Sequence, residues 1–219
     1  MRPVNSMRPH RRLHFLIMTA FANSLKITLG VPTNRGVRPR TAKCLLDLVA
    51  QNKYYDWHIL VPSEGYTIAE NRNYLAIQAL NNKSDYLLMI DDDMVFEPDL
   101  LNRLLANQKE IIGVAYHPRT DMQDKLKFLD ETHFINLETT TDPKYKTTFE
   151  CHATGTGIIL IKCEIFAMLT RPWFVFEYYD TGQVKLGEDW YFCAKAKKAG
   201  FTIWTDPSLK VGHLGEKEF

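Results

Sequence analysis

Three consecutive carboxylates, Asp91, Asp92 and Asp93, follow the apolar run Tyr86–Ile90. Such a run is typical of a strand covered on both faces, and open α/β sheets place their ligands at the carboxyl ends of strands. Alternation along an extended chain would put Asp91 and Asp93 on one side and Asp92 on the other. Two converging carboxylates repel each other unless a cation lies between them, so Asp91 and Asp93 are candidate metal ligands. The alternative is a solvated acidic turn ahead of a helix at Pro98.

A divalent ion at this position has an evident chemical use. It can bridge the two phosphates of a nucleoside diphosphate and stabilise the negative charge that develops as a sugar–phosphate bond breaks. The triplet therefore indicates Lewis-acid assistance to a phosphate leaving group.

A second acidic pair, Glu188 and Asp189, follows Gly187 at the start of a predicted helix. Exposed N–H groups and the helix dipole favour carboxylates there, so capping and function are equally supported for Glu188. Asp189 is the candidate general base, because an attacking hydroxyl must lose its proton and a nearby carboxylate can accept it.

Short apolar runs alternate with amphipathic stretches from Lys26 onward, which predicts an α/β fold with a mostly parallel sheet. Residues 116–150 lose clear periodicity and are predicted to be loop or hairpin, with weak strand signals near Phe128 and Phe134. The expected strands are 26–31, 57–61, 86–90, 111–115, 157–162, 201–204 and 209–213, and the expected helices are 39–51, 67–80, one from Pro98, a short one from Glu164 and 188–199.

Several helix ends carry local signals. Pro39 suits the first turn of a helix, and Thr67 with Glu70 has the spacing of a capping box. Gly200 is placed to end the last helix, because a glycine adopts the left-handed conformation common at that position.

The bulk composition is that of an ordinary globular enzyme. The chain has 219 residues, of which 45% are hydrophobic and 24% charged, which argues against disorder and against a disulfide-built miniprotein. One domain is expected over residues 25–219, with residues 1–24 as an extension. The net charge of +1 offers no broad attraction for nucleic acid or anionic membranes, so a nucleic-acid partner is not predicted.

The four cysteines are scattered without Cys-x-x-Cys spacing, which predicts reduced, mostly buried thiols and a cytoplasmic location. Arg11-Arg12 followed by the apolar run Leu13–Ala22 loosely resembles a secretory signal and is the less favoured alternative. That run is too short to span a bilayer, so no integral membrane segment is expected.

Three segments resemble family 2-type glycosyltransferases of the GT-A fold: Leu29–Arg35 (LGVPTNR), Tyr86–Val95 (YLLMIDDDMV) and Gly187–Cys193 (GEDWYFC) with the residues after it. The resemblance covers about residues 26–215. It implies a GT-A-like domain in which an Asp-x-Asp element binds metal and nucleotide, a Glu-Asp element supplies an acceptor-side carboxylate, and a late His completes the metal site. The matching positions are Asp91 and Asp93, Glu188 and Asp189, and His213.

The resemblance also implies contacts to the donor. A nucleotide-contacting loop matches Pro32, Thr33 and Arg35, with Asp92 beside it. Glu64 matches the position that reads the base, although its Ser-Glu-Gly setting departs from the double-Asp form common in the family. Base identity, UDP- or GDP-linked, therefore stays open.

Further candidates come from the loops and helices nearby. Gly155-Thr156-Gly157 resembles the family's sugar- or acceptor-side loop. Arg72 could reach the diphosphate or a carboxylate of the triplet, and an ordinary surface ion pair is an equal alternative. A group of aromatic residues could stack on an acceptor sugar or could form core and lid: Trp173, Phe174, Phe176, Tyr178 and Tyr179.

These features predict a metal-dependent glycosyltransferase that moves a sugar from a nucleoside-diphosphate donor to a hydroxyl acceptor, with inversion favoured over retention. A His ligand suits Mn²⁺ somewhat better than Mg²⁺. One alternative is a sugar nucleotidyltransferase, for which Pro32–Gly36 is a poor triphosphate loop. Another is a non-catalytic carbohydrate- or nucleotide-binding domain, against which the intact acidic residues argue.

Overall fold

The computed structural model describes residues 24–62, 67–116, 128–130, 133–134 and 140–214. Apart from residue 24, the expected N-terminal extension lies outside this range. So does the base-reading candidate Glu64, whose assignment stays a prediction.

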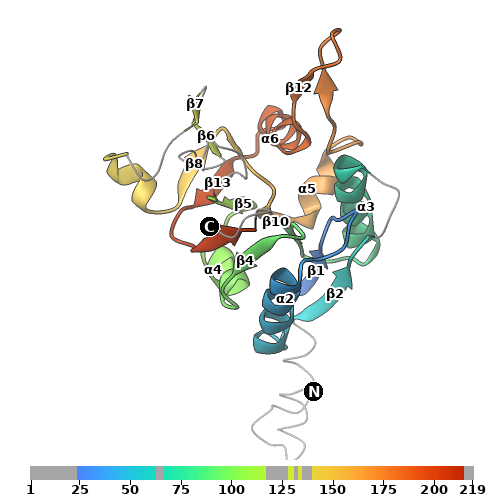
Figure 1. The fold of residues 1–219 in the computed structure, drawn as a ribbon, viewed down its shortest axis with the longest axis vertical. Coiled ribbons are helices and arrows are strands. Elements are labelled where there is room, and N and C mark those ends of the chain that lie inside the picture. The colour runs from blue at the N-terminus through green and yellow to red at the C-terminus, as the bar shows by residue number, and fades with distance from the viewer. Residues whose placement is uncertain (1–23, 63–66, 117–127, 131–132, 135–139, 215–219) are drawn as a thin grey trace, which may run out of the picture.

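A seven-stranded sheet forms the centre of the molecule, in the order β2-β1-β3-β10-β5-β13-β8 (Figure 1). Strands β2, β1, β3, β5 and β13 run in one direction, whereas β10 and β8 run in the other. The predicted α/β class with a mostly parallel sheet is confirmed. The strands are β1 Lys26–Gly30, β2 Asp56–Leu60, β3 Tyr86–Ile90, β5 Ile111–Val114, β8 Phe149–Cys151, β10 Ile158–Lys162 and β13 Ile203–Asp206.

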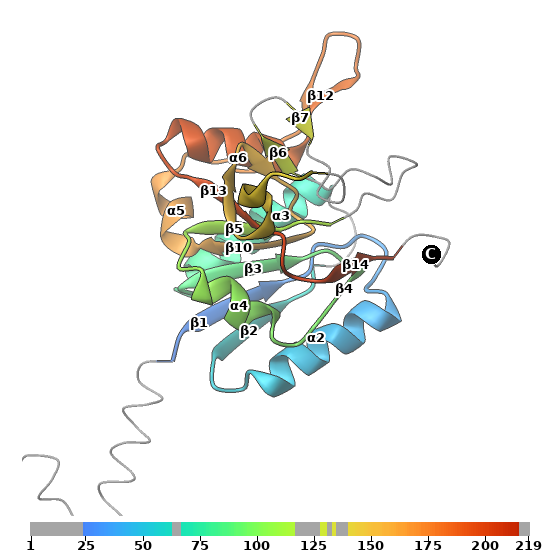
Figure 2. The ribbon, with the colours of Figure 1, turned by 90° about the vertical axis from the view of Figure 1, so that its left-hand side faces the viewer.

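Helices cover both faces of this sheet (Figure 2). Each face has its own core of fully buried side chains, one containing Leu75, Phe166 and Phe192 and the other containing Leu48 and Leu101. The buried runs of β3 and β10 separate the two cores, as expected of strands that are apolar throughout. One face carries α3 Ile68–Asn81, α5 Cys163–Met168 and α6 Glu188–Lys198, and the other carries α2 Pro39–Gln51 and α4 Leu100–Ala106.

Smaller elements surround the sheet. Strands β6 (Phe128–Asp130) and β7 (His133–Phe134) confirm the weak signals near residues 128 and 134, whereas β4 (Met94–Phe96), directly after the acidic triplet, was not expected. The remaining elements are β4 Met94–Phe96 paired with β14 Val211–His213, the sheet of β6 Phe128–Asp130, β7 His133–Phe134 and β9 Ala153–Thr154, the hairpin of β11 Glu177–Tyr178 and β12 Val184–Leu186, and the 3₁₀ turn Pro143–Lys146.

The local signals in the sequence are found in the structure. Thr67 caps α3: its hydroxyl accepts from the Glu70 N–H at 3.3 Å and its own N–H donates to the Glu70 carboxylate at 2.7 Å. Gly200 follows α6 with φ +94°, the left-handed conformation expected at a helix end.

All four cysteines are free thiols, and Cys151, Cys163 and Cys193 are buried, as predicted. None of the helices in the described part of the chain combines the length and the apolar character that a bilayer-spanning helix requires.

Candidate functional site

The acidic triplet lies at the carboxyl edge of the sheet, but it is a turn and not an extension of β3. Strand β3 ends at Ile90, the Asp91 N–H donates to the Gly157 carbonyl at 2.8 Å, and the chain then turns through Asp92 and Asp93 into β4. The expected alternation of the three side chains is therefore wrong, because it requires an extended backbone. Asp92 and Asp93 share a partner, and Asp91 has a different one.

That shared partner is Arg35, on the loop after the neighbouring parallel strand β1. Its Nη2 lies 3.5 Å from Asp92 Oδ1 and 3.2 Å from Asp93 Oδ2. The Thr33 hydroxyl donates to Asp92 Oδ2 at 2.5 Å and accepts from the Gly36 N–H at 3.0 Å, which fixes the loop against the triplet. The Arg35 side chain stays 51% exposed, so its guanidinium is accessible to a ligand.

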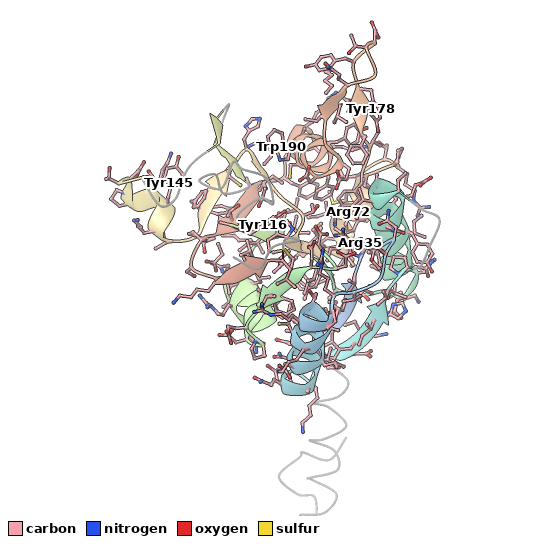
Figure 3. All side chains as sticks on the ribbon, viewed as in Figure 1. Arg35, Arg72, Tyr116, Tyr145, Tyr178 and Trp190 are labelled. Atoms are coloured by element: carbon pink, nitrogen blue, oxygen red, sulfur yellow. The ribbon has the colours of Figure 1, made fainter. Side chains whose placement is uncertain are left out.

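A cleft of about 550 Å³ opens beside this loop. Figure 3 labels Arg35 in the middle of the molecule as seen in that view. The sequence-predicted residues Pro32, Arg35, Asp91 and Asp92 are thus together on one cleft, whose lining residues are Pro32, Asn34, Arg35, Ile68, Asp91 and Asp92.

His213 lies beside the acidic triplet because strand β14, which contains it, pairs with β4. Strand β14 runs antiparallel to β4 with His213 opposite Met94, and the Leu214 N–H donates to the Asp93 carbonyl at 2.9 Å. The His213 Nε2 consequently lies 3.3 Å from Asp93 Oδ1, and the Asp93 carboxylate is completely buried. Two of the three expected metal ligands are therefore in contact, while the carboxylate of Asp91 pairs with Arg72 instead.

The separation of Asp93 and His213 is compatible with two neighbouring ligands of one divalent cation. Ligands of Mg²⁺ or Mn²⁺ lie about 2.0–2.2 Å from the ion, so neighbouring ligands in octahedral geometry are about 3 Å apart, close to the observed separation. Within the described ranges, no group of three or more His, Cys, Asp and Glu side chains is arranged to hold a metal. Such ions commonly take only one or two protein ligands and complete their shell with substrate phosphates and water.

Arg72 is the centre of a buried charge network. Its guanidinium donates to Asp91 Oδ1 at 2.8 Å, to Glu188 Oε1 at 3.2 Å and to the Thr156 carbonyl at 3.4 Å. Arg72 is only 2% exposed, so the surface ion pair considered from the sequence is wrong. Burial lowers the pKa of Arg72, but the carboxylates of Asp91 and Glu188 raise it by more, so the side chain stays charged.

This network defines what Glu188 does in the fold. Glu188 is the first residue of α6 and its side chain is buried against Arg72. The two side chains tie the start of α6 to α3 and to the end of β3. Glu188 is therefore placed to position its neighbours.

Tyr116 is a buried site residue that the sequence did not single out. Its hydroxyl accepts from the Gly157 N–H at 3.0 Å, and its ring meets the His213 ring edge-on at 5.5 Å (labelled in Figure 3). Burial and the charges of Asp91 and Asp189 raise the pKa of Tyr116 well above its ordinary value, so the phenol is protonated at neutral pH. Its position directly after the expected strand 111–115 was the feature of the sequence that could have identified Tyr116 as a candidate.

Gly157 has no side chain for a steric reason. A Cβ there would lie 2.6 Å from the Tyr116 ring. We expect Gly157→Ala to destabilise the protein by about 1–3 kcal/mol in urea unfolding, the usual cost of overpacking a core. Gly212→Ala is the matched control, because its Cβ would meet Val95 at an ordinary 3.6 Å. Equal stability of the two variants would contradict the close approach.

Asp189 lies in the first turn of α6, half-buried, and its Oδ1 accepts from the Trp190 N–H at 2.9 Å. Its charge raises the pKa of both Arg72 and Tyr116, which places it in the same electrostatic neighbourhood as Asp91. The loop Gly155–Gly157 is buried beside them and contributes the Thr156 carbonyl to Arg72.

No protein-family model matches this chain, and no curated protein matches its sequence. Among solved structures, A197 from STIV is 19% identical with a TM-score of 0.60, over 87% of this chain and 85% of A197. The inositol-1-phosphate CTP transferase from T. maritima is 10% identical with a TM-score of 0.48, over 86% of this chain and 88% of its own. TarS 1–349 from S. aureus, in complex with UDP-GlcNAc, is 10% identical with a TM-score of 0.45, over 90% of this chain and 59% of the TarS chain. What this chain shares with A197 is its fold, a mixed α/β fold with a mostly parallel central sheet, as predicted.

Proposed function

We propose that this chain is a metal-dependent glycosyltransferase of the family 2 type, which transfers a sugar from a nucleoside-diphosphate donor to a hydroxyl acceptor. One observation carries the proposal: Asp93 and His213, from distant parts of the sequence, meet at 3.3 Å at the carboxyl edge of the sheet. The cleft lined by Arg35 and Asp92 lies next to this pair. Ligands of open α/β sheets bind at this edge.

The donor would bind in that cleft. Pro32 and Ile68 supply apolar walls for a base, and the accessible Arg35 guanidinium supplies charge and hydrogen bonds for phosphate oxygens. Arg35 is already oriented by Asp92 and Asp93, so less side-chain entropy is lost when it meets the diphosphate. Binding therefore depends on the loop after β1, as the resemblance implies.

Asp93 and His213 are the residues that would hold a divalent cation. Such an ion, Mn²⁺ or Mg²⁺, would offset the negative charge that develops on the leaving diphosphate. The antiparallel pairing of β4 and β14 fixes both side chains before any ligand arrives. Tyr116 supports the arrangement, because its ring packs edge-on against the imidazole.

Asp189 would take the proton of the acceptor hydroxyl. Its carboxylate is half-buried in the first turn of α6. Arg72 and Glu188 hold this end of α6 against Asp91, so the base and the donor cleft keep a fixed separation. We propose direct displacement with inversion, in which Asp189 deprotonates the attacking oxygen as the sugar–phosphate bond breaks.

A thermal-shift panel tests the proposal. UDP, GDP and CDP, each with and without Mn²⁺, are compared on the wild type, His213→Ala and the control His152→Ala, which replaces an exposed histidine elsewhere. One diphosphate at about 100 times its Kd is expected to add about 2.7 kcal/mol, and hence roughly 5–10 °C in Tm, only with Mn²⁺. His213→Ala should lose this shift because it removes a metal ligand, and His152→Ala should keep it.

The product released by the purified protein distinguishes the glycosyltransferase proposal from its alternatives. A glycosyltransferase releases the nucleoside diphosphate when its donor sugar is transferred or hydrolysed. A sugar nucleotidyltransferase would release pyrophosphate from a nucleoside triphosphate and a sugar phosphate. Pyrophosphate release, or binding with no turnover of any donor, would contradict the assignment.

A further inference from the structure

Asn71 is a completely buried amide on α3 that the proposed reaction does not use. Its Nδ2 donates to the carbonyl of Thr33, in the loop after β1, at 3.1 Å. Within the part of the chain that the structure describes, the Asn71 Oδ1 has no hydrogen-bond partner. A buried amide oxygen without a partner lowers stability, so packing alone does not account for an asparagine at this position.

Asn71 belongs to a stripe of α3 that faces β1 and the loop after it. Ile68, Asn71 and Leu75 have the spacing i, i+3 and i+7, which puts them on one face of the helix. Leu75 packs so closely on Gly30, the last residue of β1, that a Cβ on Gly30 would lie 2.8 Å from it. Ile68 lines the cleft beside the loop. Asn71 lies between these two contacts along the helix, where its bond to Thr33 joins α3 to the loop.

Thr33 is held by both of its polar groups. Its hydroxyl donates to Asp92 Oδ2 at 2.5 Å and accepts from the N–H groups of Arg35 at 3.3 Å and Gly36 at 3.0 Å. These bonds close the turn and fix it to the acidic triplet. The bond from Asn71 to the Thr33 carbonyl fixes the same turn to a helix of the core. The backbone of the loop is therefore restrained from two directions.

Arg35 depends on this restraint for its direction. It follows Thr33 by two residues, and its side chain is 51% exposed. Its contacts with Asp92 and Asp93, at 3.5 and 3.2 Å, are both made by Nη2, at the end of a long side chain. The place of the guanidinium consequently also depends on where the backbone of residue 35 lies. A loop that had to be ordered by the ligand would give up part of the binding free energy.

We infer that Asn71 is a positioning residue for the donor: acting through Thr33, it holds the loop after β1 so that Arg35 faces the diphosphate. Asn71 itself is completely buried and out of reach of a ligand. The inference rests on the proposed transferase function, and it adds a residue that sets donor affinity without touching the donor.

Hydrogen exchange of the ligand-free protein tests the positioning directly, with Asn73→Ala as the matched control for Asn71→Ala. Asn73 lies on the same helix and also bonds to a distant segment, because it donates to the Phe174 carbonyl at 2.7 Å and accepts from the Trp173 N–H at 2.9 Å. That segment is buried in the core. Asn71→Ala should speed amide exchange in residues 33–38 at least about tenfold, because local opening becomes easier, and Asn73→Ala should leave it at the wild-type rate.

Calorimetric titration with UDP, GDP and CDP in the presence of Mn²⁺ tests the consequence for binding. Asn71→Ala should raise the Kd of the diphosphate that binds the wild type by about three- to tenfold, the range expected when one loop side chain must be ordered on binding. Asn73→Ala should keep the wild-type Kd. Asn71→Leu, which leaves little cavity, provides the same comparison if Asn71→Ala folds poorly.

Three results would overturn the inference: unchanged exchange of residues 33–38 in the Asn71 variants, an unchanged Kd despite faster exchange, or equal effects in Asn73→Ala. The two proposals fail in different ways. If no diphosphate binds the wild type, the transferase proposal fails, and the role of Asn71 in donor binding fails with it. If a diphosphate binds and the Asn71 variants bind it like the wild type, only the positioning inference fails.

Discussion

Replacing Asp189 with asparagine is expected to lower the rate of sugar transfer by about 10²–10⁴-fold, the usual contribution of a general base. Asparagine keeps the oxygen that accepts from the Trp190 N–H, so the start of α6 should stay in place. It cannot accept a proton from the acceptor hydroxyl at neutral pH. The measurement is the initial rate of donor-sugar transfer at saturating donor and acceptor.

A measurement of donor binding distinguishes the loss of the general base from damage to the folded structure. The Mn²⁺-dependent thermal shift with the nucleoside diphosphate should be unchanged in Asp189→Asn, because Asp189 is not proposed to contact donor or metal. Asp47→Asn, at a half-exposed position on α2 with an ion pair to Lys43, is the control and should transfer at the wild-type rate. An Asp189→Asn protein with full activity would remove the general-base assignment.

Arg72→Met is expected to have the largest effect on stability. It removes the cation from a buried network and leaves Asp91 and Glu188 facing each other without compensation, a change that typically costs about 3–5 kcal/mol. For a chain of this size the corresponding drop in Tm is on the order of 10 °C. Urea unfolding monitored by tryptophan fluorescence gives the free energy directly.

Two comparisons show whether burial is the cause. Arg35→Met removes a guanidinium that is 51% exposed, and it should cost less than Arg72→Met, because water already solvates the charge that is removed and Asp93 keeps its contact with His213. Neutralising the partner in Arg72→Met/Glu188→Gln should recover part of the loss, since one uncompensated buried charge is gone. If the single variants at Arg72 and Arg35 were equally stable, the buried network would not be a stabilising feature.

Much of the fold follows from local patterns in the sequence. Helices α2 and α3 begin where Pro39 and the Thr67 capping box predicted, and β3 covers the apolar run Tyr86–Ile90. These signals depend on neighbouring residues only, through backbone geometry, capping hydrogen bonds and hydrophobic periodicity. Strand β4 was missed because it has three residues and directly follows the acidic turn, so it has too little periodicity to detect.

The candidate site was predictable as a set of residues but not as a set of contacts. Strand order and chain direction place Pro32, Arg35, Asp91 and Asp92 on one cleft, because adjacent parallel strands end at the same edge. Glu64, outside the described residues, stays a prediction. Tyr116 and its contact with Gly157 had no local signal beyond the end of a strand.

The sequence by itself determined which side chains are available at this edge: the acidic triplet, the carboxylates that open the last helix and a histidine near the end of the chain. Only the tertiary structure decided how they pair. Asp91 forms an ion pair with the buried Arg72, whereas Asp93 contacts His213. The turn after Ile90 and the register of β4 against β14 determine which of these side chains meet. Periodicity describes one segment at a time, whereas pairing between charged groups depends on the relative placement of segments far apart in the chain.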